Sequence, residues 1–265
     1  MTAVLYDALG PRARRRVAIG TAIGSVLIAA VLAVVLVRLE ENGQLSGRLW
    51  SILLDPDLRQ LLVEGLGATL QVAVVALAMS LALGMLLAMG RLSHLPWLRV
   101  PVRAWVEVFR GLPPLLLIFF IYLGAPAAGV DVPAFWALTI GISLYNSAAI
   151  GEIIRAGILS LPRGQSEAAQ AIGLSHASTM RLVVLPQAIR LMLPALISQM
   201  VVLLKETSLG FIIGYTELLR NGRIAVEFLG GAYAIPVYTG IALVYLVVNL
   251  TLSWTARRVD RRFQR

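Results

Sequence analysis

The most unusual pair of residues that could carry chemistry stands inside an apolar stretch. Lys205 and Glu206 interrupt the run 191–213 and are followed by Thr207 and Ser208. A charged side chain at the centre of a bilayer costs roughly 2.5–3.5 kcal/mol on insertion scales, so such residues usually face a protein interior or a water-filled path. Lysine, threonine and serine could bind a zwitterionic head group or an acidic side chain of a small ligand. The alternative is a structural ion pair at a helix kink or subunit interface.

Three further polar residues inside or beside apolar stretches are candidates for the same path. Asn146 and Ser147 stand near the middle of the run 132–151, where they could form hydrogen bonds to a ligand. Packing between helices through small polar residues explains these two at least as well. Arg110 precedes Gly-Leu-Pro-Pro at 111–114. This position favours either a gate that attracts anions or, more simply, a side chain that extends to the membrane interface.

The remaining polar groups favour structural roles and exclude several classes of site. Glu152 and Arg155 are three residues apart, so on a helix they would form a structural ion pair on one face. His94 and His176 are the only histidines and lie far apart in the sequence, and the chain has no cysteine, so no metal site is predicted. An intramembrane enzyme is disfavoured because Glu206 is the only acid deep in an apolar run and lacks an obvious partner.

The composition indicates a membrane protein. Of the 265 residues, 58% are hydrophobic and only 14% are charged, whereas about 25% are charged in soluble domains. The net charge of +9 could suggest nucleic acid, but 22 of the 23 basic residues are arginine and they cluster beside apolar runs. We therefore expect no nucleic acid partner. The preference for arginine over lysine is typical of a GC-rich genome, which indicates a multi-pass protein of a bacterial plasma membrane.

The apolar runs predict the elements that must position these residues. A transmembrane helix needs about 20 apolar residues, because the hydrocarbon core is about 30 Å thick and a helix rises 1.5 Å per residue. Six stretches qualify, and the charged pair at 205–206 interrupts one of them. They are residues 17–37, 66–90, 111–130, 132–151, 191–213 and 228–256. The sequence thus predicts an all-α membrane protein with about six transmembrane helices.

The distribution of arginine predicts the orientation, because cytoplasmic loops carry an excess of positive charge. The basic segments are the N-terminal arm 1–16, the connections 91–110 and 155–190, and the tail 257–265. In contrast, the extracytoplasmic connection 38–63 is acidic, and Asp131 lies in a very short turn. Both termini are therefore expected in the cytoplasm, which agrees with an even number of spans.

The cytoplasmic connection at 160–186 is too polar to cross the membrane and carries its own helix signals. Residues 165–172 favour a helix, and Gly173 can adopt the left-handed conformation that ends one. Ser175 is a suitable cap for a second helix, which we expect to stop at Pro186. A short helix, a glycine bend and a second helix are predicted.

This connection resembles the coupling loop of bacterial ATP-binding-cassette import permeases. The resemblance is carried by Glu-Ala-Ala at 167–169, a glycine at 173 and Val-Val-Leu-Pro at 183–186, where the first valine replaces the family's usual isoleucine. In that family the loop fits a groove on a cytoplasmic ATPase and transmits its closure to the membrane helices. The resemblance implies a coupling loop at 157–190 whose coupling residues are Glu167, Ala168, Ala169, Gly173 and Pro186.

The resemblance extends over most of residues 64–256 and is finer than the superfamily. The segments 107–114, 145–157 and 204–209 resemble signatures of permeases for polar amino acids, and the segment 5–16 is similar to glutamate importers of GC-rich Gram-positive bacteria. The family implies the five-helix core of type I importers at 64–256, so the helix at 17–37 would be an N-terminal addition. Glutamate is the implied substrate, with glutamine, arginine and histidine left open.

The resemblance also implies the partners. These are two copies of a cytoplasmic ATPase, an extracellular amino acid-binding protein, and a second permease that is either another copy or a different, shorter chain. The sequence has no Walker A phosphate-binding loop, so this chain would bind no cofactor and ATP and Mg would bind to the ATPase. The basic tail 257–265 would contact anionic membrane lipids. The alternative is a stand-alone ion-coupled carrier, although the signature segments do not repeat at a fixed offset.

Overall fold

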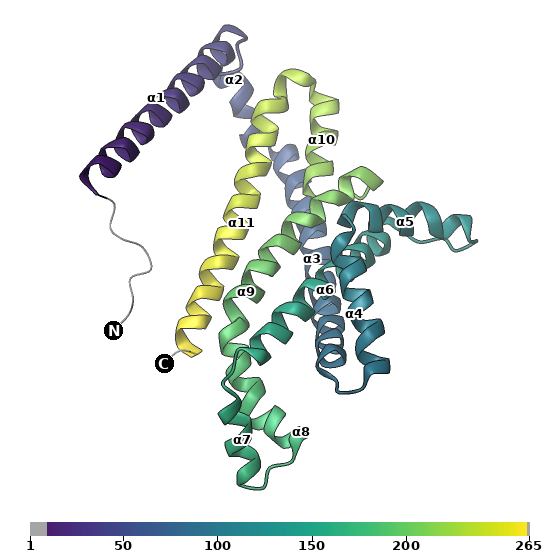
Figure 1. Cartoon of the computed structure of the whole chain (residues 1–265). Helices are drawn as coiled ribbons and strands as arrows, with labels where there is room; N and C mark the ends of the chain where they lie inside the picture. Colours follow the sequence, from purple (N-terminus) through teal and green to yellow (C-terminus); the bar gives the residue numbers. More distant parts are fainter. Residues whose placement is uncertain (1–9, 264–265) are drawn as a thin grey trace. The chain divides into compact units, whose positions relative to one another are not determined.

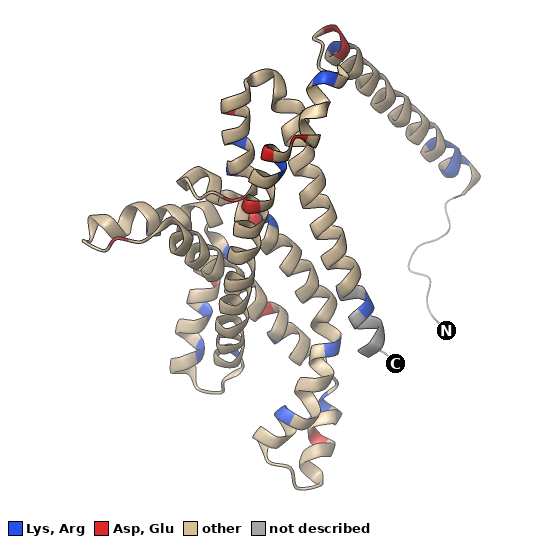
Figure 2. Cartoon of the chain, turned by 180° about the vertical axis from the view of Figure 1, so that it is seen from behind, with Lys and Arg blue, Asp and Glu red and all other residues tan. Residues whose placement is uncertain are grey.

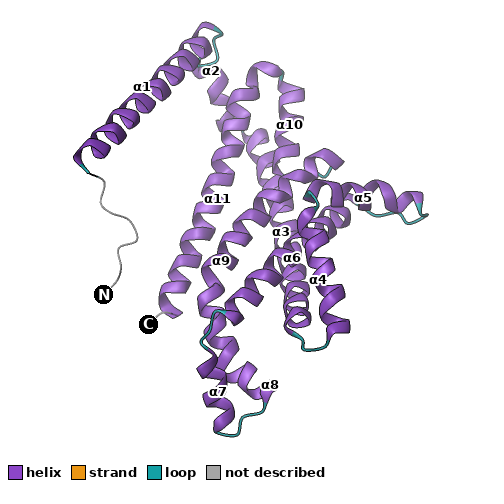
Figure 3. Ribbon diagram, viewed as in Figure 1, coloured by secondary structure: helices purple, strands orange, loops and turns teal. Residues whose placement is uncertain are grey.

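The computed structural model describes residues 10–263, and within that range the chain is helical apart from its connecting loops (Figure 3). This confirms the predicted all-α class. The chain divides into two compact units, residues 1–52 and residues 53–265. The predicted arm at 1–16 and the basic tail at 257–265 lie partly outside the described residues.

The first unit is built on a long apolar helix, α1, which covers Pro11–Glu41 and contains the span predicted at 17–37. Pro11 stands in the first turn, where its missing N–H costs no helical hydrogen bond. The charged residues of α1 lie at its two ends (Figure 2), and none of its side chains is buried. With a mean hydropathy of 2.6 in its most apolar 18-residue window, α1 is long and apolar enough to cross a membrane. The short helices α2, Gly47–Trp50, and η1, Ser51–Leu54, follow it.

The second unit is organised around α3, Pro56–Leu92, and α6, Ala134–Leu159, which pack along each other (Figure 1). Small residues bring the two backbones together. A Cβ atom on Gly84 would lie 3.0 Å from the Ser147 carbonyl oxygen, and one on Gly151 would lie 3.1 Å from the Gly84 carbonyl oxygen. Ser143 Oγ of α6 donates to the Ala76 carbonyl oxygen of α3 at 3.4 Å. Such close approach is the usual way in which small residues pack membrane helices.

The span predicted at 111–130 is not one continuous helix. The structure instead has α4, Pro96–Gly111, and α5, Pro114–Ala127, with a bend of 97° between them. Pro113 and Pro114 supply no N–H, and Leu112 before them is extended, with ψ at 136°. The 14 residues of α5 reach only about 21 Å at 1.5 Å per residue. Crossing a core of about 30 Å therefore needs part of α4, which occupies most of the expected connection 91–110.

The predicted pair of cytoplasmic helices forms, but the second helix does not stop at Pro186. α7 covers Arg163–Ala171, α8 covers His176–Thr179, and a π-helical turn at Met180–Val184 joins α8 to α9, Leu185–Glu206. In that turn the Leu185 N–H donates to the Met180 carbonyl oxygen, five residues back. This wider turn accommodates the proline ring and its missing donor, so the run from His176 to Ile213 is continuous.

The last part of the chain holds one more helix than the sequence predicts. After the 3₁₀ segment η3, Thr207–Ile213, the helix α10 covers Leu218–Leu229 and precedes η4, Gly231–Tyr233, and α11, Ala234–Phe263. The predicted start of the last span at 228 is therefore wrong. Gly230 has φ at +101°, which ends α10 and reverses the chain before α11.

The described residues contain five helical segments that are long and apolar enough to cross a membrane. The bent pair α4–α5 adds a sixth if its halves form one span. The expectation of about six transmembrane helices is thus confirmed, while several of the expected boundaries move.

The close approach of α3 to α6 gives a test of the packing. We expect Gly84→Val to destabilise the protein by about 1–3 kcal/mol, because overpacking forces backbones apart. The added side chain would meet Ile150 Cγ2 at 2.8 Å and the Ser147 carbonyl oxygen. Gly67→Val is the matched control on the same helix, since a Cβ atom there meets nothing within 4 Å. Thermal unfolding of both variants in detergent measures the difference, and equal losses would contradict this packing.

Candidate functional site

The Glu-Ala-Ala segment lies on α7, whose end is fixed by a specific hydrogen-bond pattern. Gly173 has φ at +89° and its N–H donates to the Gln170 carbonyl oxygen at 2.9 Å. The Leu174 N–H donates to the Ala169 carbonyl oxygen at 3.2 Å, which completes the helix-ending motif that favours glycine. Ser175 then caps α8, because its Oγ accepts from the Ser178 N–H at 3.2 Å. The bend predicted at Gly173 is therefore an ordered turn.

This turn presents a mostly small and apolar surface. Glu167 and Ala168 are exposed, whereas Ala169 is buried on the opposite side of α7. Ile172, in the cap of α7, is 80% exposed. On the inner side, Gln187 of α9 donates to Gln165 of α7 at 3.3 Å. Pro186 is exposed in the first turn of α9. The structure thus brings the predicted coupling residues to one end of the second unit (Figure 1).

A chain of polar side chains joins the middle of α6 to the C-terminal part of α9. Asn146 Nδ2 donates to Glu206 Oε2 at 2.6 Å and to the Ile142 carbonyl oxygen at 2.9 Å. Gln199 Nε2 donates to Asn146 Oδ1 at 2.7 Å. Glu206, for which the sequence offered no obvious partner, therefore has one in Asn146. Gln199 was missed, although its position seven residues before Glu206 places both on one helix face.

The other predicted path residues divide between exposed and buried positions. Lys205 is exposed, while the adjacent Glu206 is half-buried and turned toward α6. Thr207 is fully buried and donates to the Leu204 carbonyl oxygen at 2.7 Å, and Ser208 Oγ donates to the Lys205 carbonyl oxygen at 2.7 Å. The Ser147 hydroxyl donates within α6, to the Leu144 carbonyl oxygen at 2.8 Å. Of this set, Lys205 presents an exposed charged group.

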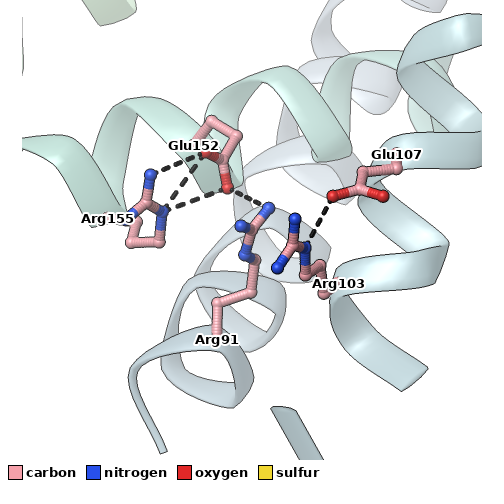
Figure 4. A network of polar contacts seen from close by, with 5 residues as sticks. All are labelled: Arg91, Arg103, Glu107, Glu152 and Arg155. Atoms are coloured by element: carbon pink, nitrogen blue, oxygen red, sulfur yellow. Dashed lines mark hydrogen bonds and ion pairs between the residues drawn. The ribbon is translucent and has the colours of Figure 1, made fainter. Parts of the chain in front are cut away.

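Charged residues of α3, α4 and α6 lie near one another (Figure 4). Glu152 accepts from Arg155 at 3.0 Å, as their spacing predicts, and also from Arg91 of α3 at 2.8 Å. Arg103 and Glu107 pair along α4 at 2.7 Å, and both are exposed. The Arg91–Glu152 contact is the one that ties two helices together, since exposed pairs within a helix contribute little. Arg110 is exposed at the end of α4, beside the break at Leu112.

A second polar cluster, which the sequence did not reveal, surrounds Glu217 in the connection between the spans. Its side chain is completely buried and accepts from the Leu219 N–H at 2.9 Å, the Arg220 N–H at 2.8 Å and the Tyr245 hydroxyl at 3.1 Å. Burial raises the pKa of Glu217, and these donors oppose the rise. Glutamate is not a favoured helix cap, so its position before Leu218 carried no clear signal.

The two histidines are closer in space than the sequence suggests. The rings of His94, between α3 and α4, and His176, at the start of α8, have centroids 6.3 Å apart. Within the described part of the chain, no group of three or more histidine, cysteine or acidic side chains could hold a metal ion. The histidines therefore bring the α3–α4 connection next to the segment that follows Gly173.

Comparison with known proteins identifies the family. Residues 80–265 match the model of the binding-protein-dependent transport system inner membrane component. The chain is 38% identical over 231 residues to the glutamate transport system permease protein GluD of Corynebacterium glutamicum. This alignment covers 85% of this chain and 84% of the relative. It is also 38% identical over 208 residues to the glutamine transport system permease protein GlnP of Escherichia coli K12, covering 77% and 93%.

Solved structures give the same result. A chain of an amino acid ABC transporter crystallised with histidines is 34% identical, covers 77% of this chain and 94% of its own, and superposes with a TM-score of 0.72. A chain of the inward-facing MetNI methionine transporter, at 22% identity and a TM-score of 0.66, shares the fold. Together with the predicted signatures and the membrane helices, these matches show that the chain belongs to the inner-membrane permease subunits of binding-protein-dependent amino acid ABC importers.

Proposed function

We propose that this chain forms half of the translocation pathway of an ATP-driven glutamate importer and couples to a cytoplasmic ATPase through the loop 157–190. The observation that carries the proposal is the ordered turn at Gly173, which presents Glu167, Ala168 and Ile172 at the surface. Small residues let a partner surface approach closely, and the single carboxylate beside them adds a charge that the partner can recognise. In the proposed orientation, with both termini in the cytoplasm, this surface faces the ATPase.

One continuous helical run would connect this surface to the membrane interior. α8, the π-helical turn and α9 form one helical run, so a partner that moves α7 and α8 also moves α9. The last turn of α9 carries Lys205 and Glu206, and Glu206 is bonded to Asn146 on α6. Movement of the loop would therefore reach the polar residues in the middle of the membrane. A continuous helix that ends in Lys205 and Glu206 could carry the closing motion of the ATPase dimer to these two residues.

The assembly that this function requires has several subunits. A binding protein would deliver the amino acid from outside, two ATPase copies would bind ATP and Mg, and a second permease, either a copy or a different shorter chain, would complete the path. The relatives support this arrangement by name, since they are permease proteins of transport systems for glutamate and glutamine. Basic residues near the C-terminal end of α11 would contact anionic lipids.

Lys205 supports glutamate as the substrate. It is the only lysine in the chain and lies exposed at the end of α9, in a stretch where a charge without a function is costly. An ammonium group there can bind a carboxylate of the substrate. Ser208, whose hydroxyl donates to the Lys205 carbonyl oxygen, could add a polar contact beside it. Asn146 is fully buried and bonded to Glu206 and Gln199, and Thr207 bonds within its own helix, so both favour structural roles.

Charge reversal at the loop tests the coupling. We expect Glu167→Lys to reduce amino acid-stimulated ATP hydrolysis by the complete complex in lipid vesicles at least about tenfold. The reason is that a like or unmatched charge at an interface costs several kcal/mol. The ATPase should also dissociate more readily from the membrane subunits, as measured by co-purification.

The matched control is Glu41→Lys, which reverses an exposed acid at the end of α1, outside the residues that match the family model. It should leave both hydrolysis and co-purification unchanged. If Glu167→Lys leaves stimulation and association intact, the loop does not couple to an ATPase. The ion-coupled carrier then becomes the function to test, by uptake into vesicles under an ion gradient without ATP.

The substrate contact is tested at Lys205. We expect Lys205→Ala to lower the initial rate of glutamate uptake about tenfold or more, because a hydrogen bond to a charged group contributes about 1.5–3 kcal/mol. Lys205→Arg keeps the positive charge and should retain most of the uptake. Uptake by Lys205→Ala at the normal rate, with normal complex assembly, would leave Lys205 as a structural residue. Competition with glutamine, arginine and histidine in the same assay identifies the preferred amino acid.

A further inference from the structure

The buried carboxylate of Glu217 is more than a helix cap. It accepts from the Leu219 and Arg220 N–H groups at the start of α10, and serine or asparagine could serve those donors without burying a charge. A third donor, the Tyr245 hydroxyl, comes from α11. Burying a carboxylate is costly unless it is fully hydrogen-bonded, so the contact with α11 gives the glutamate a role that a smaller cap could not fill.

The contact between Glu217 and Tyr245 lies where three helices meet. Tyr245 belongs to α11, and Glu217 stands directly before α10. Thr69 Oγ1 of α3 accepts from the Leu218 N–H at 3.1 Å, which ties α3 to the start of α10. We call the four residues Thr69, Glu217, Leu218 and Tyr245 the outer junction. Its members join α3, α10 and α11.

The elements around the outer junction pack too closely to slide independently. A Cβ atom on Gly65 of α3 would lie 2.9 Å from the Leu218 Cα, so α3 and α10 are in backbone contact. Asn221 Nδ2 of α10 donates to the Leu61 carbonyl oxygen at 2.8 Å. On the other side, Gly222 of α10 packs directly against Ile241 of α11. Because these contacts are close-packed, α10 can move only together with α3 and α11.

The outer junction stands at the far end of the helical run that begins within the coupling loop. That run extends from His176 to Ile213 and so ends four residues before Glu217. α7 and α8 lie at one end of the second unit, and α10 lies at the other (Figure 1). A movement of α9 that starts at the loop would reach α10 through η3 and Glu217, which bonds to Tyr245 of α11.

We propose that Glu217 and Tyr245 are positioning residues that transmit the movement of α9 to α10 at the extracytoplasmic side of the permease. This inference rests on the proposed function, because it requires an ATPase that moves α9. The Tyr245–Glu217 hydrogen bond keeps α10 in step with α11 and η3, so the outer end of the path opens and closes with the coupling loop. Without the bond, α10 no longer follows, and binding protein on the outside no longer stimulates hydrolysis on the inside.

The experiment uses the complete complex in lipid vesicles, with the substrate-loaded binding protein enclosed on the extracytoplasmic side. Tyr245→Phe removes only the hydroxyl group. We expect it to leave assembly and basal ATP hydrolysis unchanged and to reduce stimulation by loaded binding protein at least about tenfold. Glu217→Gln keeps the shape of the side chain and one of its two acceptor oxygens, and it should also reduce this stimulation. Tyr238→Phe is the matched control, since Tyr238 is exposed on the same helix.

Two outcomes would overturn the inference. If Tyr245→Phe lowers the melting temperature but each assembled complex is stimulated normally, the outer junction is structural only. If both Tyr245→Phe and Glu217→Gln are stimulated normally with unchanged stability, the junction transmits nothing. Glu167→Lys, measured in parallel, separates this inference from the proposed function. Loss of stimulation in Glu167→Lys with normal stimulation in Tyr245→Phe rejects the junction alone, whereas normal stimulation in Glu167→Lys rejects the coupling function on which it rests.

Discussion

The structure depends on one constraint: inside a bilayer, each polar group must find its partner within the protein. Asn146 illustrates it, since one side-chain amide satisfies Glu206, Gln199 and the Ile142 carbonyl oxygen together. The cost of an unpaired group is several kcal/mol, so this network fixes the rotation of α9 against α6. This has a consequence for Lys205, which precedes Glu206 and points about 100° around the helix from it. Because the network fixes Glu206 toward α6, Lys205 is held on an exposed side of α9.

The same constraint explains why α3 and α6 are built from small residues. When serine and glycine line the seam, the backbones come close enough for hydroxyl groups to bond to carbonyl groups within and between the helices, as Ser143 does to Thr139 and Ala76. The close pair then serves as a fixed frame. Near the last turn of α3 the pair is held by the Arg91–Glu152 ion pair, and toward the start of α3 it contacts α10 through Gly65.

Much of the fold could be predicted from residue types, because hydropathy and helix signals are local properties. The apolar runs predicted about six spans, and Gly173 and Ser175 predicted the bend of the loop. Two of the omissions have a common physical origin in contacts distant along the chain. The partner of Glu206 and the burial of Glu217 against Tyr245 both depend on a neighbouring helix that the local sequence does not specify. The π-helical turn before Pro186 is a local adjustment that the residue types did not indicate. Proline had opposite effects at two positions. The prolines at 113–114 interrupt the helix, whereas the helix continues through Pro186.

The difference between those two prolines bears on how the permease moves. At 113–114 two successive residues lack donors, so no single wider turn can restore the hydrogen-bond ladder and the span bends by 97°. At 186 one missing donor is accommodated by one π-helical turn, and the helix continues to Glu206. A bend absorbs displacement, whereas a continuous helix transmits it. The loop that would meet the ATPase is attached to the continuous helix, and two residues of that helix, Gln199 and Glu206, carry the polar contacts to Asn146 of α6.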